Sequence, residues 1–200
     1  MLTIYLLRHG QTQWNADGGR YLGRTDIPLT EKGISQAHDT ANQLAGVSFT
    51  AIYSSPLQRA LHTAQIVGGG KPVITDDRLV ETDFGAWEGK TKEEITKEDS
   101  ALTTSWEEDP STTKAGGTGE TALDLVTRVA GFFQSLHQQH KEGNILVVAH
   151  NGVNRFYLAH KLGMPLKNYH KLVQDNASIT LFTLDKQESL VLQKLNSRIS

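Results

Sequence analysis

Three short segments of the 200-residue chain carry side chains that could handle a phosphate group. They are Arg8-His9-Gly10, Ser54–Arg59 and Ala149–Gly152. Arginine offers a planar fork of donors that matches phosphate oxygens. Histidine can act as a nucleophile through one ring nitrogen when the other nitrogen donates a hydrogen bond that sets the tautomer. The segments hold two arginines and two histidines, and they therefore predict a phosphate site if the fold brings them together.

The pattern of apolar residues predicts that each segment follows a strand and opens a helix. Strands are expected over short apolar runs, and helices where apolar residues recur at helical spacing, over residues 34–45, 57–67 and 122–136. The six expected strands are Thr3–Leu7, Ala51–Tyr53, Val73–Thr75, Ile145–Ala149, Ser178–Leu184 and Leu190–Lys194. Alternating strands and helices predict a three-layer α/β/α sandwich with a mostly parallel central sheet. The last two strands follow each other closely, so we expect an antiparallel edge.

In such a sheet, ligands gather where the carboxyl ends of strands meet the amino ends of helices. Ser55 is expected to cap one of these helices with Pro56 at its first position, and Asn151 is expected to cap another. Helix amino ends attract phosphate through free N–H groups and the helix dipole. Gly10 would let the backbone approach closely. One histidine at a strand end is usually structural, but two at equivalent positions favour a functional site.

The bulk properties indicate a single globular domain over residues 1–200, with residues 90–118 as an excursion that could serve as a lid. The net charge of -2 does not favour nucleic acid, and the lack of cysteine excludes disulfides and thiolate chemistry. No apolar run approaches the roughly 20 residues of a membrane span, and no signal peptide is recognisable, so we expect a cytoplasmic protein without a membrane partner. The spacing of His137 and His140 permits metal binding, but their polar neighbours favour solvated side chains. We expect no metal or other cofactor, and whether the chain forms a homodimer is left open.

Several segments, in order, resemble the histidine phosphatase superfamily in its phosphoglycerate mutase-like branch. The resemblance extends from residue 4 to about residue 184. It rests on Arg8-His9-Gly10, Gly23–Gly33, Arg59 after Ser54-Ser55-Pro56, Glu81 in the run from Glu81 to Gly89, Gly117–Thr121, and His150-Asn151-Gly152.

The resemblance implies a role for each matching residue. His9 would be the nucleophile that becomes phosphorylated, and Glu81 the general acid and base. Arg8, Arg59 and His150 would form the phosphate pocket. Further phosphate or substrate contacts would come from Asn15, Gln11, Gly23 and Asn151.

The resemblance implies a phosphatase that hydrolyses small phosphate monoesters and whose ligand is a small phosphorylated metabolite. A cofactor-dependent phosphoglycerate mutase is one alternative, but such mutases carry paired arginines where residues 82–119 contain none. A second alternative is a non-catalytic module that binds a phosphorylated ligand without turnover. The presence of both His9 and Glu81, the expected nucleophile and general acid, speaks against it. Trp87 and Trp106 are expected either at the mouth of the site or in the core.

Overall fold

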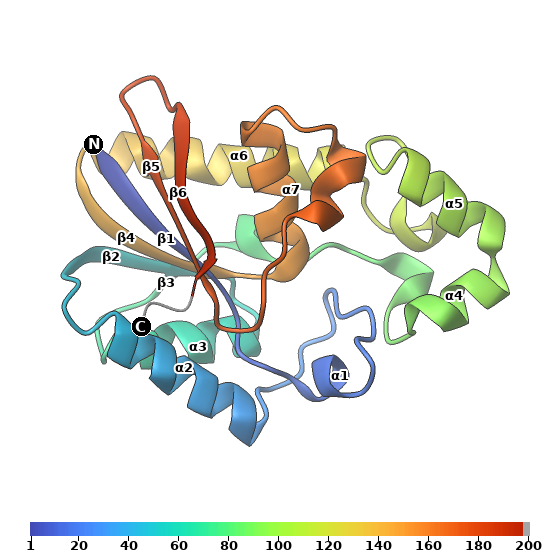
Figure 1. Cartoon of the computed structure of the whole chain (residues 1–200), viewed down its shortest axis with the longest axis horizontal. Helices are drawn as coiled ribbons and strands as arrows, with labels where there is room; N and C mark the ends of the chain where they lie inside the picture. Colours follow the sequence, from blue (N-terminus) through green and yellow to red (C-terminus); the bar gives the residue numbers. More distant parts are fainter. Residues whose placement is uncertain (198–200) are drawn as a thin grey trace.

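The computed structural model describes residues 1–197, which build a six-stranded sheet in the order β3-β2-β4-β1-β5-β6 (Figure 1). The strands are β1 (Leu2–Arg8), β2 (Phe49–Ser54), β3 (Ile74–Thr75), β4 (Gly143–Ala149), β5 (Ile179–Leu184) and β6 (Leu190–Ser197). Each expected strand is therefore present. The first four run parallel, whereas β5 is antiparallel to both β1 and β6. The predicted parallel sheet with an antiparallel edge is confirmed.

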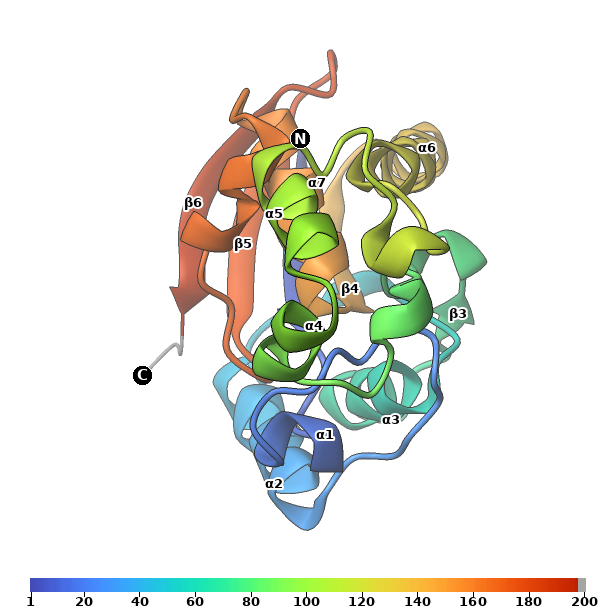
Figure 2. The same ribbon diagram turned by 90° about the vertical axis from the view of Figure 1, so that its right-hand side faces the viewer.

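Helices cover both faces of the sheet, as the three-layer prediction requires. Figure 1 shows α2 (Glu31–Gln43) and α3 (Gln58–Val67) on one face, and α6 (Ala122–Gln139) and α7 (Asn151–Lys161) on the other. Figure 2, turned by 90°, also places α2 and α3 together on one side and α6 on the opposite side. Within residues 1–197, no helix is both long and apolar enough to cross a bilayer.

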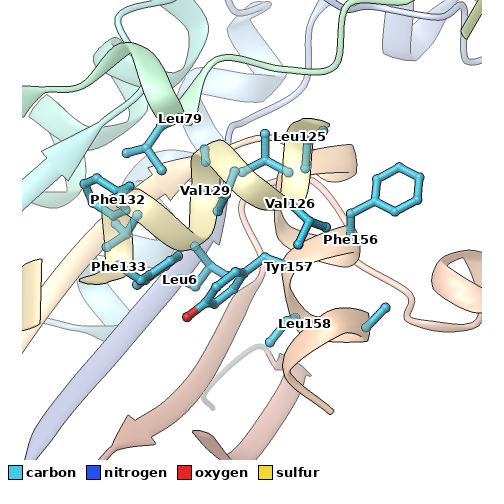
Figure 3. Packing of buried hydrophobic residues seen from close by; sticks show 14 of the residues in the cluster. Leu6, Leu79, Leu125, Val126, Val129, Phe132, Phe133, Phe156, Tyr157 and Leu158 are labelled. Carbon is cyan, nitrogen blue, oxygen red and sulfur yellow. The ribbon is translucent and has the colours of Figure 1, made fainter. Parts of the chain in front are cut away.

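The apolar run of β4 is explained by burial on both faces of the sheet. Ile145 and Val147 join the cluster under α6 and α7, whereas Leu146 and Val148 join the cluster under α3. Successive side chains of a strand point to opposite faces, so a central strand in a three-layer fold must be apolar at every position. Figure 3 shows the larger cluster, in which the ring of Phe133 stacks on that of Tyr157 at 4.2 Å between centroids.

The segment between Glu81 and α6 is more regular than its sequence suggests. It contains two short helices, α4 (Lys92–Glu98) and α5 (Ser100–Glu108), which lie at the far end of the molecule from the amino terminus (Figure 1). Ile95 and Trp106 are buried, and Trp87 packs against Trp106 in the core. Helices this short bury one or two residues each, so periodicity cannot reveal them. Of the two roles left open for both tryptophans, core packing is confirmed.

The starts of two helices differ from the expectation. Helix α3 begins at Gln58, whose backbone N–H donates to the Asp26 carboxylate at 2.8 Å, so Ser55 does not cap it. Helix α7 is capped at position 150, and Asn151 is its first helical residue. In both cases the carboxylate of a residue distant in sequence, Asp26 for α3 and Glu81 for α7, accepts the N–H groups that a local cap would satisfy.

Candidate active site

The carboxyl ends of β1, β2 and β4 bring the three sequence segments together. The His9 backbone N–H donates to the Ala149 carbonyl at 3.1 Å, and the Ser55 N–H donates to the Val148 carbonyl at 3.0 Å. The residues that follow the three strands are therefore neighbours across the sheet. The rings of His9 and His150 lie 5.1 Å apart between centroids at an angle of 60°. The predicted convergence of the two histidines is present.

His9 is held in one tautomer. Its Nδ1 lies 2.7 Å from the carbonyl oxygen of Gly10, which can only accept a hydrogen bond, so Nδ1 carries the proton and Nε2 keeps its lone pair. Burial lowers the pKa of His9 well below 6.5, and the charges of Arg59 and Arg8 lower it further. The ring is therefore neutral near pH 7. A neutral imidazole with a free Nε2 is the form that can attack phosphorus.

The backbone after His9 explains the glycine at position 10. A Cβ atom there would lie 2.3 Å from the carbonyl oxygen of Gly33 at the start of α2. The Gly10 N–H also donates to the Thr63 hydroxyl at 3.1 Å. The loop that carries His9 is thus clamped between α2 and α3, which fixes the ring without using its Nε2 atom.

His150 is fully buried beside the His9 ring, and one of its ring nitrogens is engaged. Its Nε2 lies 2.8 Å from the Ser55 hydroxyl, whereas Nδ1 is buried and has no hydrogen-bond partner within residues 1–197. The Ser55 hydroxyl also accepts from the Leu57 N–H at 3.3 Å, so its own proton is free to go to Nε2. Nδ1 would then carry its proton toward a ligand. Burial lowers the pKa of His150 well below 6.5, and the positive charge of Arg59 lowers it further.

Two arginines make the site electropositive. Arg59 is fully buried, and its terminal nitrogens donate to the backbone carbonyls of Thr25 and Gly23 at 2.9 and 2.6 Å. Arg8 donates to the Gln174 carbonyl at 2.8 Å. Burial lowers the pKa of Arg8 to about 10, which still leaves it charged at neutral pH. The Nε atoms of both arginines are buried without a partner in the described part of the chain, a costly state that an anion would relieve.

Glu81 is anchored at the amino end of α7. Its carboxylate accepts the backbone N–H groups of Gly152 at 3.0 Å and Val153 at 3.1 Å, and also that of Thr82 at 2.8 Å. A Cβ atom on Gly152 would stand 2.6 Å from a Glu81 oxygen, so the glycine after His150-Asn151 is required for this contact. Glu81 is only 3% exposed, and it lines the same cavity as His9.

The remaining predicted contact residues fall into two groups. Asn15 and Asn151 line the cavity, and the Asn15 amide oxygen is held by Thr12 and Asn176, which leaves its NH₂ group available. Gln11 and Gly23 do not line it. The Gln11 side chain accepts from the Thr30 hydroxyl at 3.3 Å, and Gly23 contributes its carbonyl to Arg59. These two residues therefore position Thr30 and Arg59 and do not contact a ligand in the cavity.

The cavity has a volume of about 280 Å³ and includes several residues that the sequence analysis missed. Its lining residues are Arg8, His9, Asn15, Gly19, Arg20, Tyr21, Leu22, Glu81, Phe84, Lys92, Asn151, Gly152, Arg155, Phe156 and Tyr169. Arg155 could have been found, because it lies one helical turn after Asn151. Tyr169 could not, because it reaches the cavity from a separate 3-10 helix, η4 (Leu166–Lys171). A wider hollow of about 670 Å³ along α2 contains none of the predicted site residues.

The two histidines suggested as a metal pair contact different partners. His140 Nε2 lies 2.9 Å from the Tyr53 hydroxyl, and His137 Nδ1 lies 3.8 Å from the Glu188 carboxylate. Both are half-buried, not solvated as expected. Over residues 1–197, no group of three or more His, Asp or Glu side chains is arranged to hold a metal ion.

Comparison with known proteins agrees with this geometry. A family model described as the histidine phosphatase superfamily (branch 1) matches residues 4–197. Phosphoserine phosphatase 1 of Hydrogenobacter thermophilus is 33% identical over 198 residues, covering 98% of this chain and 92% of that protein. The adenosylcobalamin/alpha-ribazole phosphatase of Escherichia coli is 34% identical over 200 residues, covering 98% and 97%. The crystal structure of phosphoserine phosphatase in complex with 3-phosphoglyceric acid from Entamoeba histolytica is 34% identical, covers both chains completely, and superposes with a TM-score of 0.90.

These similarities cover nearly the whole chain at an identity that indicates common descent. The predicted fold class is confirmed by the structural match, and the predicted class of enzyme, a phosphomonoesterase acting on small molecules, is confirmed at the level of the family. The chain belongs to the histidine phosphatase superfamily, branch 1.

Proposed function

We propose that this protein hydrolyses small phosphorylated metabolites through a phosphohistidine on His9. The observation that carries the proposal is the state of that ring, which is neutral, buried, and free at Nε2 because Nδ1 donates to Gly10. In the first step Nε2 attacks phosphorus and the bond from phosphorus to the substrate oxygen breaks. In the second step water attacks the same phosphorus, the bond to Nε2 breaks, and inorganic phosphate leaves.

Arg8, Arg59 and His150 stabilise the charge on the transferring phosphoryl group. Arg8 lines the cavity, whereas Arg59 and His150 are fully buried and act on it through their position next to its wall. The Nε atoms of both arginines are fixed and without a partner among the described residues, so binding requires little reorganisation. The NH₂ group of Asn15 and the side chain of Asn151 add contacts at the edge. This arrangement supplies the positive charge that a metal ion provides in other phosphatases.

In its protonated form Glu81 gives its proton to the leaving oxygen in the first step, and the resulting carboxylate accepts a proton from water in the second. Its position beside Arg8 and His9 in the cavity suits both transfers. The backbone donors of α7 hold the carboxyl group in one orientation, and a fixed orientation keeps a general acid within hydrogen-bond reach of the reacting oxygen.

The test combines turnover with trapping of the intermediate. Phosphate release is measured over a panel of phosphorylated metabolites, and the reaction is stopped by denaturation to detect an acid-labile phosphate on the peptide that contains His9. The variant His9→Ala is expected to show neither turnover nor the labelled peptide. Full activity in this variant would refute the mechanism. The exposed His38 lies on α2, and His38→Ala serves as the matched control with unchanged activity.

A further inference from the structure

The cavity contains more positive charge than a phosphate site needs. Beyond Arg8, its wall includes Arg20, Lys92 and Arg155. Arg20 is paired with the Glu94 carboxylate at 2.9 Å, and Lys92 with the Glu107 carboxylate at 2.6 Å. These two cations on the rim are therefore already neutralised by carboxylates of α4 and α5.

Arg155 is different, because no carboxylate within residues 1–197 forms an ion pair with it. Its Nε donates to the backbone carbonyl of Tyr169 at 3.1 Å, and its guanidinium lies 4.8 Å from the centroid of the Tyr169 ring. That ring in turn stacks on Phe156 at 3.9 Å between centroids. The guanidinium plane is thus fixed by stacking and by one hydrogen bond, both made to η4.

The hydrogen bond made by Nε leaves the two terminal nitrogens of Arg155 as an unused pair. No described residue accepts a hydrogen bond from them. Burial lowers the pKa of Arg155, and Tyr169 and then the Glu81 carboxylate oppose this shift. Glu81 acts on Arg155 without forming an ion pair with it, and a bound anion in direct contact would lower the cost of burying the guanidinium.

We propose that Arg155 binds a carboxylate of the substrate, and that the protein therefore acts on phosphorylated carboxylic acids. The proposal rests on the function proposed above. One unpaired cation matches one additional negative charge, and the two parallel donors of a guanidinium fit a carboxylate. The volume of about 280 Å³ lies at the small end of ligand sites, which favours an acid of a few carbon atoms. Tyr21 and Phe84, packed edge to face at 4.9 Å, form the apolar wall beside it.

The test uses substrate pairs that differ only at the carboxylate. O-phosphoserine is compared with O-phosphoethanolamine, and 3-phosphoglycerate with glycerol 3-phosphate, by kcat/KM for phosphate release. Hydrogen bonds to a charged group are worth about 1.5–3 kcal/mol, so the unaltered enzyme should prefer each acid by about 10- to 150-fold. Arg155→Gln should lower kcat/KM for the acids by this factor, mainly through KM, and bring the ratio within each pair close to one.

Two further variants keep the result interpretable. Arg155→Lys retains the charge and loses the fork, so its preference should be intermediate, and it carries the test if the glutamine variant does not fold. Lys161→Gln removes a cation from the same helix outside the cavity and should leave the ratio unchanged. The proposal is overturned if the unaltered enzyme shows no preference, or if every Arg155 variant that folds keeps the full preference. Absence of phosphate release from every compound would instead contradict the proposed function.

Discussion

Mild acidification should destabilise this protein through His9 and His150. Both rings are buried, with 3% and 0% of their surface exposed, and both have a pKa well below 6.5. Burial is the main cause, because it penalises the charged imidazolium, and the neighbouring arginines act in the same direction. In the unfolded chain each histidine is hydrated and takes up a proton near pH 6.5.

The sign and size follow from proton linkage. Above about pH 6.5 both rings are neutral in the folded and the unfolded chain, so their contribution is constant. Below that pH the unfolded chain binds one more proton per histidine, and the free energy of unfolding falls by about 1.4 kcal/mol per pH unit for each. Two histidines give about 2.7 kcal/mol per pH unit until the folded rings themselves titrate. A domain is typically stable by about 5–15 kcal/mol, so two units of pH, about 5.4 kcal/mol, would unfold a domain at the lower end of that range and clearly weaken one at the upper end.

The assay is urea unfolding at pH values from about 7.5 to about 5, a window above the 3.8 and 4.5 at which ordinary carboxyl groups titrate. His150→Gln and His9→Gln should each halve the slope of stability against pH. His38→Gln, at an exposed position on α2, should leave it unchanged. The reasoning is refuted if the two buried variants keep the full slope, whatever their absolute stability.

Three further outcomes are expected from the proposed chemistry. Glu81→Gln should slow both formation and hydrolysis of the phosphoenzyme by about 10²- to 10⁴-fold, which is the usual contribution of general acid–base catalysis. Rapid-quench kinetics with a substrate that has a poor leaving group measure both steps, and unchanged rates would move the acid role to Asp83 or Glu88. Activity should survive exhaustive chelation, because fixed arginines supply the positive charge. If activity were lost and returned only after a divalent metal was added, the site would require another description. The phosphoenzyme should hydrolyse rapidly without stimulation by 2,3-bisphosphoglycerate, since residues 82–119 contain no arginine to hold a mutase intermediate. Phosphorus NMR with 3-phosphoglycerate present measures the products. Formation of 2-phosphoglycerate with little inorganic phosphate would contradict this prediction.

The strands and the position of the three phosphate-site segments could be predicted from the sequence because they depend on local patterns. The unbroken apolar run of β4 requires burial on both faces, and this places it at the centre of a parallel sheet. Parallel neighbours end at the same edge, so His9 and His150 had to approach each other once β1 and β4 were adjacent. The role proposed for Glu81 rests on the resemblance of the chain to a family, since nothing in the spacing of Glu81 distinguishes it from other acidic residues of the loop.

The support of those side chains was decided by tertiary structure. Asp26 caps α3 from 32 residues away, which frees Ser55 to bind His150 across 95 residues of sequence. Arg155 lies on α7 and acquires its orientation from Tyr169, which lies on a different helix, η4. Local sequence sets which residues a strand or helix presents, because its period is built into the backbone. Which donor meets which acceptor depends on the packing of elements distant in the chain, and the lowered pKa values and the unpaired cation arise from that packing.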